Sequence, residues 1–367
     1  MQSKYWKIAA TVCRLILGVT FIFSGFSKVI DPWGTSLKVN EYLSIYSAEW
    51  LTAGSMGFSI WLCGAELMMG CMLLFKVRIR LISIFAFVSM LFFSLLTFFS
   101  ATWIPVEDCG CFGEAIKLSP WQTFTKNIVL LPMAYIVWRR YRPDKIFSFT
   151  QWEIFLTCLF FSLSMGIGIY CYRHLPLIDF LPYHEGLNLR EARFHPDTDQ
   201  HESTTTLIYR NRATGEEHEF SLDDAEWRDD TKWEWVETST ESTTSGVRPL
   251  IGEFSLRDAE GDATEEILSD SGKVYMLCAT SFAHISRTCD TQFKKVVEYA
   301  QQTGARVVCL TPEPLRDITY HTFAGSIGVR CYNIDATTLK TMLRADTGLI
   351  VLSDGVIKAK RNCRDLY

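Results

Sequence analysis

The chain has 367 residues, of which 48% are hydrophobic, and its formal net charge is −5. The charge is divided unevenly: the first 173 residues hold 15 Lys and Arg against 9 Asp and Glu, and the remaining 194 hold 21 against 32. A basic, apolar first half and an acidic, polar second half predict a membrane domain joined to a soluble domain. The acidic balance excludes nucleic acid as an expected partner, because phosphate binding needs clustered Lys and Arg.

Five apolar runs are long enough, at about 20 residues, to cross a bilayer as helices. They lie at about 8–30, 55–75, 80–103, 122–138 and 152–172. No small-residue cleavage site follows the first run, so we expect a retained span rather than a cleaved signal peptide. Between the first two spans, residues 36–51 have the apolar spacing of a helix that lies flat on the outer surface.

The short loops predict the orientation, because Lys and Arg collect on the cytoplasmic side of membrane proteins. Basic residues precede the first span and fill the second-to-third and fourth-to-fifth connections, whereas the other two connections are acidic. The N-terminus is therefore expected in the cytoplasm, and an odd number of spans places residues 174–367 outside. These features predict a multi-pass protein of a bacterial inner membrane with a periplasmic C-terminal domain.

The soluble half divides into two patterns. Residues 176–247 favour β-structure, with a hairpin candidate in TTTLIYRNRATGEEHEFSL, an alternating strand in TKWEWVETS and a Ser/Thr-rich linker at the end. Residues 248–367 alternate strands and helices: KVYMLCAT, ARVVCLT and GLIVLSDGVIKAK are strand-like, and one helix should end at Gly304. Such alternation predicts a sheet with helices packed against it.

This order of elements resembles a thioredoxin-like domain of the kind found in peroxiredoxins and envelope thiol-disulfide proteins. The resemblance implies a Cys-x-x-Cys pair after the strand at 273–278, but Phe282 and Ile285 occupy the expected cysteine positions. The proline expected before the last hairpin is also missing. The domain is therefore expected to be thioredoxin-like in shape, inactive in dithiol exchange and used for docking. Cys289, near a helix start, is either a single reactive thiol or a partly buried cysteine.

The connection between the third and fourth spans reads VEDCGCFGEAIKLSP, in which Gly110 separates Cys109 from Cys111. The glycine relaxes the backbone enough for a disulfide to close, and strained, exposed disulfides are the labile kind that exchange. The flanking carboxylates, Asp108 among them, disfavour a thiolate, although one could accept its proton. A static turn or static disulfide remains an alternative. No metal is expected, because zinc usually takes four Cys or His ligands and this loop offers two.

Charged residues also lie within the predicted spans. Counted from the nearest basic loop residues, Glu66 and Arg14 both lie about 10–15 Å above the cytoplasmic edge. Because charges in a bilayer are costly and normally paired, we expect Glu66 and Arg14 to pair. Such a pair is either a structural link between two helices or a proton or quinone head-group site. Lys28, at the outer end of the first span, should either approach the Cys-Gly-Cys loop and favour a thiolate, or snorkel to the interface.

These residues form a pattern: Arg, Gly, Ser-Gly, Lys and Asp-Pro along the first span, a glutamate on the second, and Cys-Gly-Cys before the fourth. The positions are Arg14, Gly18, Ser24, Gly25, Lys28, Asp31, Pro32, Glu66, Cys109, Gly110 and Cys111. The pattern resembles the DoxX-like superfamily and, within it, the branch of the methylamine-utilisation protein MauE, over about residues 1–140. The resemblance implies a four-helix membrane bundle and a role in maturing a disulfide-rich partner; the wider superfamily is linked to sulfur oxidation and quinone reduction.

The expected fold class is thus an α-helical membrane bundle, DoxX/MauE-like with a fifth span, that carries an exported β-rich segment and a thioredoxin-like α/β domain. The expected domains are the four-helix bundle at 1–145, the fifth span at 146–175, the β-rich segment and linker at 176–247 and the thioredoxin-like domain at 248–367.

Two functions from different classes follow, so the sequence leaves open whether the protein is an enzyme. The favoured one is thiol-disulfide exchange through Cys109 and Cys111 in support of exported-protein maturation. An exported or envelope protein would be the client, lipid would surround the spans, and a quinone is the candidate electron acceptor. The alternative is a non-catalytic membrane subunit or scaffold of an envelope complex, which docks partners through its thioredoxin-like domain.

Overall fold

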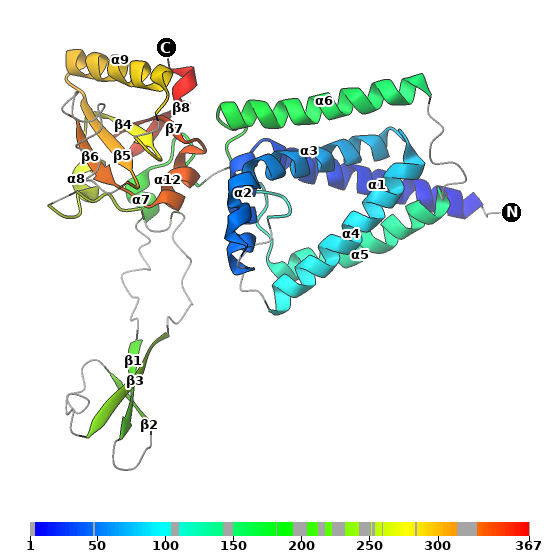
Figure 1. Ribbon diagram of the computed structural model, residues 1–367, viewed down its shortest axis with the longest axis horizontal. Helices are drawn as coiled ribbons and strands as arrows, with labels where there is room; N and C mark the ends of the chain where they lie inside the picture. The colour runs from blue at the N-terminus through cyan, green and yellow to red at the C-terminus, as the bar shows by residue number, and fades with distance from the viewer. Residues whose placement is uncertain are drawn as a thin grey trace. The chain divides into compact units, whose positions relative to one another are not determined.

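The computed structural model describes residues 4–46, 48–103, 110–141, 150–180, 182–193, 204–211, 217–221, 232–241, 251, 254–258, 260–282, 285–313 and 329–366. The predicted site residues Asp108 and Cys109 lie outside these ranges. The chain forms two compact units (Figure 1): Met1–Leu187 with Ser255–Tyr367, and Asn188–Phe254. The first unit contains a helical bundle and an α/β domain, and the second contains a small antiparallel sheet.

The bundle consists of long helices that pack both against sequence neighbours and against helices farther along the chain. They are α1 (Lys4–Val29), α2 (Pro32–Ile45), α3 (Ser55–Leu74), α4 (Ile79–Thr102), α5 (Pro120–Arg140) and α6 (Gln151–Arg173), with the short 3₁₀ helix η1 (Glu49–Gly54) before α3. α1 packs on α3 and α5, α4 packs on α5, and both α2 and α6 pack on α3. Local sequence sets the starts of α5 and α6, because Ser119 and Thr150 each form a capping box. In each box the cap side chain accepts from the backbone amide three residues later, and the side chain of that later residue accepts from the backbone amide of the cap.

Four of the described helices are long and apolar enough to cross a bilayer: Lys4–Val29, Trp50–Leu74, Ile79–Thr102 and Gln151–Arg173. These helices confirm four of the five predicted apolar runs and a helical membrane bundle. The fifth run, 122–138, forms α5, which is less apolar because Gln122, Lys126 and Asn127 lie in its first turns. Asn127 donates to the Phe93 carbonyl, 3.3 Å away, so part of this polarity is satisfied inside the bundle.

α1 and α3 approach each other through glycine. A Cβ atom at Gly70 would lie 2.5 Å from the backbone nitrogen of Ile22, and one at Gly25 would overlap the backbone of Leu67. Lipid supplies no hydrophobic force between helices, so close backbone packing at small residues is what joins membrane helices. The glycines therefore explain why these two helices touch along their length.

The α/β domain is built on a mixed five-stranded sheet. Its strands are β4 (Lys273–Ala279), β5 (Arg306–Thr311), β6 (Arg330–Asn333), β7 (Thr347–Ser353) and β8 (Val356–Asn362), in the order β6-β5-β4-β7-β8. β4, β5 and β6 run parallel, whereas β7 is antiparallel to β4 and β8. This confirms the predicted sheet, although the four-residue β6 was not predicted because it is too short to show a periodic pattern.

Helices flank this sheet as the sequence predicts. They are α8 (Thr264–Leu268), α9 (Arg287–Thr303), α12 (Ala336–Leu343) and the 3₁₀ helix η4 (Cys363–Asp365). α9 packs on β4 and β5 and ends at Gly304, whose φ of 68° is the left-handed value that glycine favours. The second unit holds α7 (Leu189–Arg193) and an antiparallel sheet in the order β2-β1-β3, formed by β1 (Thr204–Asn211), β2 (Glu217–Ser221) and β3 (Trp233–Glu241).

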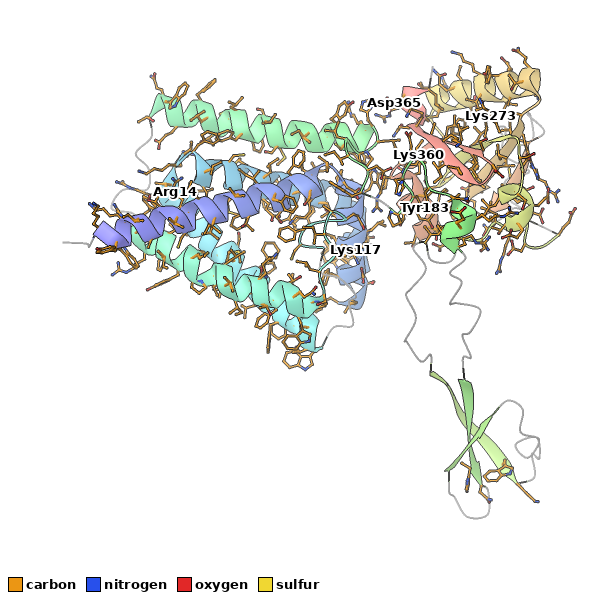
Figure 2. The ribbon with its side chains drawn as sticks, turned by 180° about the vertical axis from the view of Figure 1, so that it is seen from behind. Arg14, Lys117, Tyr183, Lys273, Lys360 and Asp365 are labelled. Atoms are coloured by element: carbon orange, nitrogen blue, oxygen red, sulfur yellow. A yellow bond between two sulfur atoms is a disulfide. The ribbon has the colours of Figure 1, made fainter. Side chains whose placement is uncertain are left out.

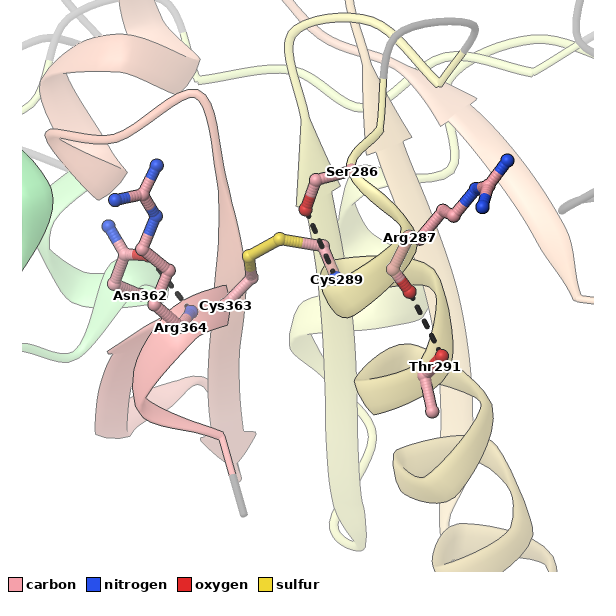
Figure 3. The surroundings of a disulfide bond; sticks show 7 residues. All are labelled: Ser286, Arg287, Cys289, Thr291, Asn362, Cys363 and Arg364. Carbon is pink, nitrogen blue, oxygen red and sulfur yellow. Dashed lines mark hydrogen bonds between the residues drawn. A yellow bond between two sulfur atoms is a disulfide. The ribbon is translucent and has the colours of Figure 1, made fainter.

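A disulfide joins the first turn of α9 to the end of the chain (Figure 3). It links Cys289 to Cys363 with their Cα atoms 5.3 Å apart, while Ser286 caps the helix beside it. Both cysteines are nearly fully buried. The interpretation of Cys289 as a single reactive thiol is therefore wrong, because its sulfur is bonded to a partner 74 residues away. Closing a loop of that length stabilises the domain by about 4 kcal/mol in the chain-entropy account.

We expect Gly70→Ala to destabilise the bundle, because the added methyl group meets the backbone of Ile22 and overpacking costs about 1–3 kcal/mol. Gly57→Ala on the same helix is the matched control, since a Cβ atom there meets nothing within 4 Å. Thermal unfolding of the detergent-solubilised protein, followed by circular dichroism, measures both variants. Equal midpoints for the two would contradict the close approach of α1 and α3.

Candidate functional site around Cys111

The bundle buries one ion pair between its two glycine-packed helices. Lys28, in the last turn of α1, donates through Nζ to Oε2 of Glu66 on α3. The two side chains are only 11% and 9% exposed. Two charges in an apolar interior persist only when each neutralises the other, so this contact fixes how α1 and α3 face one another.

This contact corrects the predicted pairing of Glu66 with Arg14. The Arg14 guanidinium instead donates through Nη1 to the carbonyls of Leu73 and Leu74, the latter 2.7 Å away. Those carbonyls belong to the last turn of α3, beyond the regular i+4 ladder, and the Leu73 carbonyl also accepts from the Lys76 amide at 3.3 Å. Glu66 lies seven residues earlier, about 10 Å along the helix, out of reach of Arg14. The prediction failed because the depths of Arg14 and Glu66 in the bilayer were counted from the lysines in the loops, whereas the position of Arg14 relative to Glu66 depends on where α3 ends. Figure 2 labels Arg14 on α1.

Cys111 is held at the end of the bundle where α1 ends. The Ser24 hydroxyl donates to the Cys111 carbonyl at 2.5 Å, which ties the loop to α1. Gly110 and Gly113 have φ of 59° and 56°, left-handed values that favour glycine, and the Gly113 amide donates to the Gly110 carbonyl at 3.1 Å. The ring of Phe112 meets that of Phe23 edge to face, with centroids 5.3 Å apart. The loop around Cys111 is therefore fixed by contacts on both sides of the cysteine.

Two cavities meet at Lys28 and Cys111. The larger, about 320 Å³, lies among α2, α3, α4 and the cysteine loop. Its walls are mainly apolar and include the rings of Tyr42, Tyr46, Phe58, Phe92 and Phe93. The smaller, about 40 Å³, is lined by both members of the ion pair together with Cys111. The structure therefore places the ammonium group of Lys28 beside the cysteine loop while it pairs with Glu66.

A residue of the α/β domain completes this end of the bundle. Arg344 follows α12 with φ of 53°, is 1% exposed, and places Nη2 3.2 Å from Oε1 of Glu114. Its Nε lies 3.1 Å from Oδ2 of Asp31, an ionic contact without hydrogen-bond alignment. Burial raises the pKa of the Asp31 carboxyl, and the Arg344 guanidinium opposes that shift. Asp31 also caps α2 through the Gly34 amide, so one carboxylate serves both a helix start and the contact with Arg344.

An ion pair and a histidine–carboxylate hydrogen bond join the α/β domain to the segment at the end of α6. Lys360 Nζ lies 2.7 Å from Oδ2 of Asp179, and His174 Nδ1 lies 2.7 Å from Oδ1 of Asp365. Burial lowers the pKa of Lys360, and the hydrogen bond to Asp179 opposes the shift. Figure 2 labels Lys360 and Asp365 in the α/β domain. Sequence reasoning missed Arg344 and Lys360, because an isolated basic residue carries no sign of a partner more than 100 positions away.

These features define a helical membrane protein in which a cysteine loop sits beside a buried ion pair and receives an arginine from a C-terminal α/β domain. The family model described as "Methylamine utilisation protein MauE" matches residues 6–139, which extend from α1 to the last turn of α5. Residues 6–139 are thus a MauE-type membrane segment, as the sequence pattern predicted, and they indicate a membrane role in a redox or maturation context. Among curated proteins, none matches the chain.

Lys28→Met should lower the free energy of unfolding by about 3–5 kcal/mol, because it leaves Glu66 as an unpaired buried charge. The double variant with Glu66→Leu should recover most of that loss. Lys294→Met is the control: it breaks an ion pair with Asp290 whose lysine is 48% exposed, and should cost about 0.5 kcal/mol at most. Unfolding in detergent gives the free energy of unfolding of all three variants. A double variant that is no more stable than Lys28→Met would refute the pairing.

Arg344→Met should make the cysteine loop more accessible, because Asp31 and Glu114 lose their shared cation. Arg344→Lys should rescue only in part, since one ammonium cannot reproduce the planar fork that meets both carboxylates. The measurement is the alkylation rate of Cys111 in the reduced, detergent-solubilised protein. Arg361→Met is the control, because its contact with Glu185 is largely exposed. Unchanged alkylation in both Arg344 variants would show that the contact does not shield the loop.

Proposed function

We propose that the protein is a thiol-disulfide redox protein of a bacterial inner membrane, which supports the maturation of exported proteins through Cys109 and Cys111. The observation that supports this most directly is the position of Cys111. Its loop is tied to α1 by Ser24, and it lines both cavities that contain Lys28. A cysteine that only filled a turn would need neither a fixed loop nor a buried charge beside it.

The exchange step balances without an added reagent. A client thiolate attacks one sulfur of the Cys109–Cys111 disulfide, forming a mixed disulfide and releasing the other loop sulfur as a thiolate. The second client thiol loses its proton and displaces the remaining loop sulfur, so the client gains a disulfide. The loop disulfide has then gained two electrons, and its two sulfurs become thiols when they take up protons. Lys28 supplies the positive charge that stabilises a thiolate at Cys111, and Glu66 holds that lysine in place.

The large cavity suits a lipid-soluble ring compound as the electron acceptor, and we propose a quinone. Cavities of about 300–1,000 Å³ with apolar walls and few polar groups are typical of small-molecule sites. This cavity has about 320 Å³ and five aromatic rings in its walls, and its polar lining includes Cys111 and the charged side chains of Lys28, Asp31, Lys38 and Glu114. A bound quinone would supply a sink for two electrons and two protons. The chain's part is to exclude water with the aromatic walls and to present Lys28 and the thiol together.

The same proposal assigns the topology and the role of the second half. α5 has 21 residues, about 31 Å of helix, and packs along α4, so we propose that it also crosses the bilayer. Five spans then place the α/β domain outside, and the disulfide of Cys289 with Cys363 suits an oxidising periplasm. We propose that this domain is thioredoxin-like in shape and holds the client or a partner of a membrane complex.

A non-catalytic subunit of an envelope complex is the second candidate. The observation in its favour is that Phe282 occupies an expected cysteine position and that the helix-start cysteine, Cys289, is already held by Cys363. In that case the bundle anchors a docking domain, and the cysteine loop is a static turn. The two candidates differ in whether Cys109 and Cys111 change oxidation state.

Trapping thiols by acid quenching of living cells should show Cys109 and Cys111 as a mixture of dithiol and disulfide. Cys111→Ser should accumulate a mixed disulfide between Cys109 and a client, because the second sulfur that resolves it is missing. Cys158→Ser is the control, since that cysteine is exposed on α6, outside the loop. In purified protein, a short-chain quinone should oxidise the reduced pair. A permanently oxidised pair with no trapped client would support the scaffold and exclude exchange.

A further inference from the structure

The sheet of the α/β domain brings two cysteines together that are far apart in sequence. β5 and β6 are parallel neighbours, and their register places Cys309 directly opposite Cys331. Partners in register on adjacent strands point to the same face, with their backbones about 4.7–4.9 Å apart. Disulfides join Cα atoms about 4.4–6.8 Å apart, so the backbone already holds this pair at a bonding separation.

The two thiols contact each other and differ in environment. The interaction between the two thiols lowers the pKa of Cys331 and raises that of Cys309. The Cys331 thiol donates through Sγ to the carbonyl oxygen of Val329, 3.9 Å away. Cys309 is 0% exposed, whereas Cys331 is half-buried on β6, which is an edge strand of the sheet. Cys331 is thus the more accessible of the two thiols and the one with the lower pKa, and Cys309 lies behind it.

The other cysteines of the domain do not share this arrangement. Cys289 and Cys363 are nearly fully buried and close a long loop, which suits a structural bond. Cys278 is buried on β4, donates to the Met276 carbonyl at 3.6 Å, and lies one position out of register, because the partner of Cys309 on β4 is Leu277. Burial raises the pKa of Cys278, so it remains a thiol.

We propose that Cys331 and Cys309 form a second dithiol-disulfide site, which exchanges with disulfides of exported polypeptides independently of Cys109 and Cys111. Cys331 acts as the attacking thiolate and Cys309 as the resolving thiol. A disulfide between directly paired strands has little freedom to relax its torsion, which makes it more readily reduced than a structural disulfide.

Each step conserves atoms and electrons. The Cys331 thiolate attacks one sulfur of the substrate disulfide, so a mixed disulfide forms and one substrate thiolate leaves and takes up a proton. Cys309 then gives up its proton and attacks the sulfur of Cys331, which releases the second substrate thiolate. The substrate gains two electrons and becomes two thiols, and the site becomes a Cys309–Cys331 disulfide. The reverse sequence oxidises a substrate dithiol.

The test equilibrates the full-length protein in detergent with a series of reduced and oxidised glutathione mixtures. Acid quenching, alkylation and peptide mass spectrometry then report each cysteine separately. We expect a Cys309–Cys331 link that forms and breaks reversibly while Cys289–Cys363 stays oxidised throughout. Two thiols that remain alkylatable across the series in folded protein would overturn the proposal. So would a link that persists until Cys289–Cys363 is also reduced.

Variants give a second readout. Cys309→Ser should trap Cys331 as a mixed disulfide with glutathione, which the wild type resolves; Cys278→Ser, the matched buried control, should cycle like the wild type. A Cys309→Ser protein without that adduct would overturn the assigned roles. If Cys309→Ser does not fold, the wild-type titration decides alone. The double variant Cys109→Ser with Cys111→Ser should still cycle at Cys309–Cys331, which separates this site from the cysteine loop.

Discussion

The buried ion pair between Lys28 and Glu66 is the constraint on which the bundle depends. Neither charge is tolerable alone in an apolar interior, so the end of α1 must stay against the middle of α3. That approach is possible only because glycines let the two backbones touch. With α1 fixed, Ser24 can hold the cysteine loop and Asp31 can start α2 one turn beyond the lysine. Ser24, Gly25, Lys28 and Asp31 thus act together to position α1, α3, the start of α2 and the cysteine loop.

The same arrangement explains why the α/β domain contacts this end of the bundle with an arginine. Asp31 and Glu114 bring two carboxylates to one place, and Glu114 follows Cys111 by three residues. Arg344 can meet both because a guanidinium presents its donors in a fixed fork. Its almost complete burial means that removing it leaves two acids without their shared cation. The charge beside the cysteine loop is therefore set by both halves of the chain.

Local signals in the sequence were enough to predict much of this fold. Long apolar runs, the helix end at Gly304 and the alternating strands depend on neighbours a few residues apart, and the structure contains them. The partner of Glu66 was assigned wrongly, because depth along a helix depends on where its neighbour ends. The disulfide between Cys289 and Cys363 was not predicted for a related reason, because cysteine connectivity cannot be deduced from sequence alone. Arg344 and β6 gave no local pattern at all.

In this protein the surroundings of a cysteine, rather than a sequence motif, decide whether its sulfur packs as a thiol, forms a structural disulfide or can exchange. Cys63 and Cys171 pack among apolar side chains between helices, where a neutral thiol behaves as a small hydrophobic group, and Cys63 also donates to the Thr35 hydroxyl at 3.5 Å. Cys289 and Cys363 are joined and buried, which protects a bond from exchange. Exchange needs a second sulfur within reach and one sulfur open to a substrate, a condition that strand register can satisfy without any Cys-x-x-Cys sequence. A search for that motif therefore passes over the pair that β5 and β6 bring together.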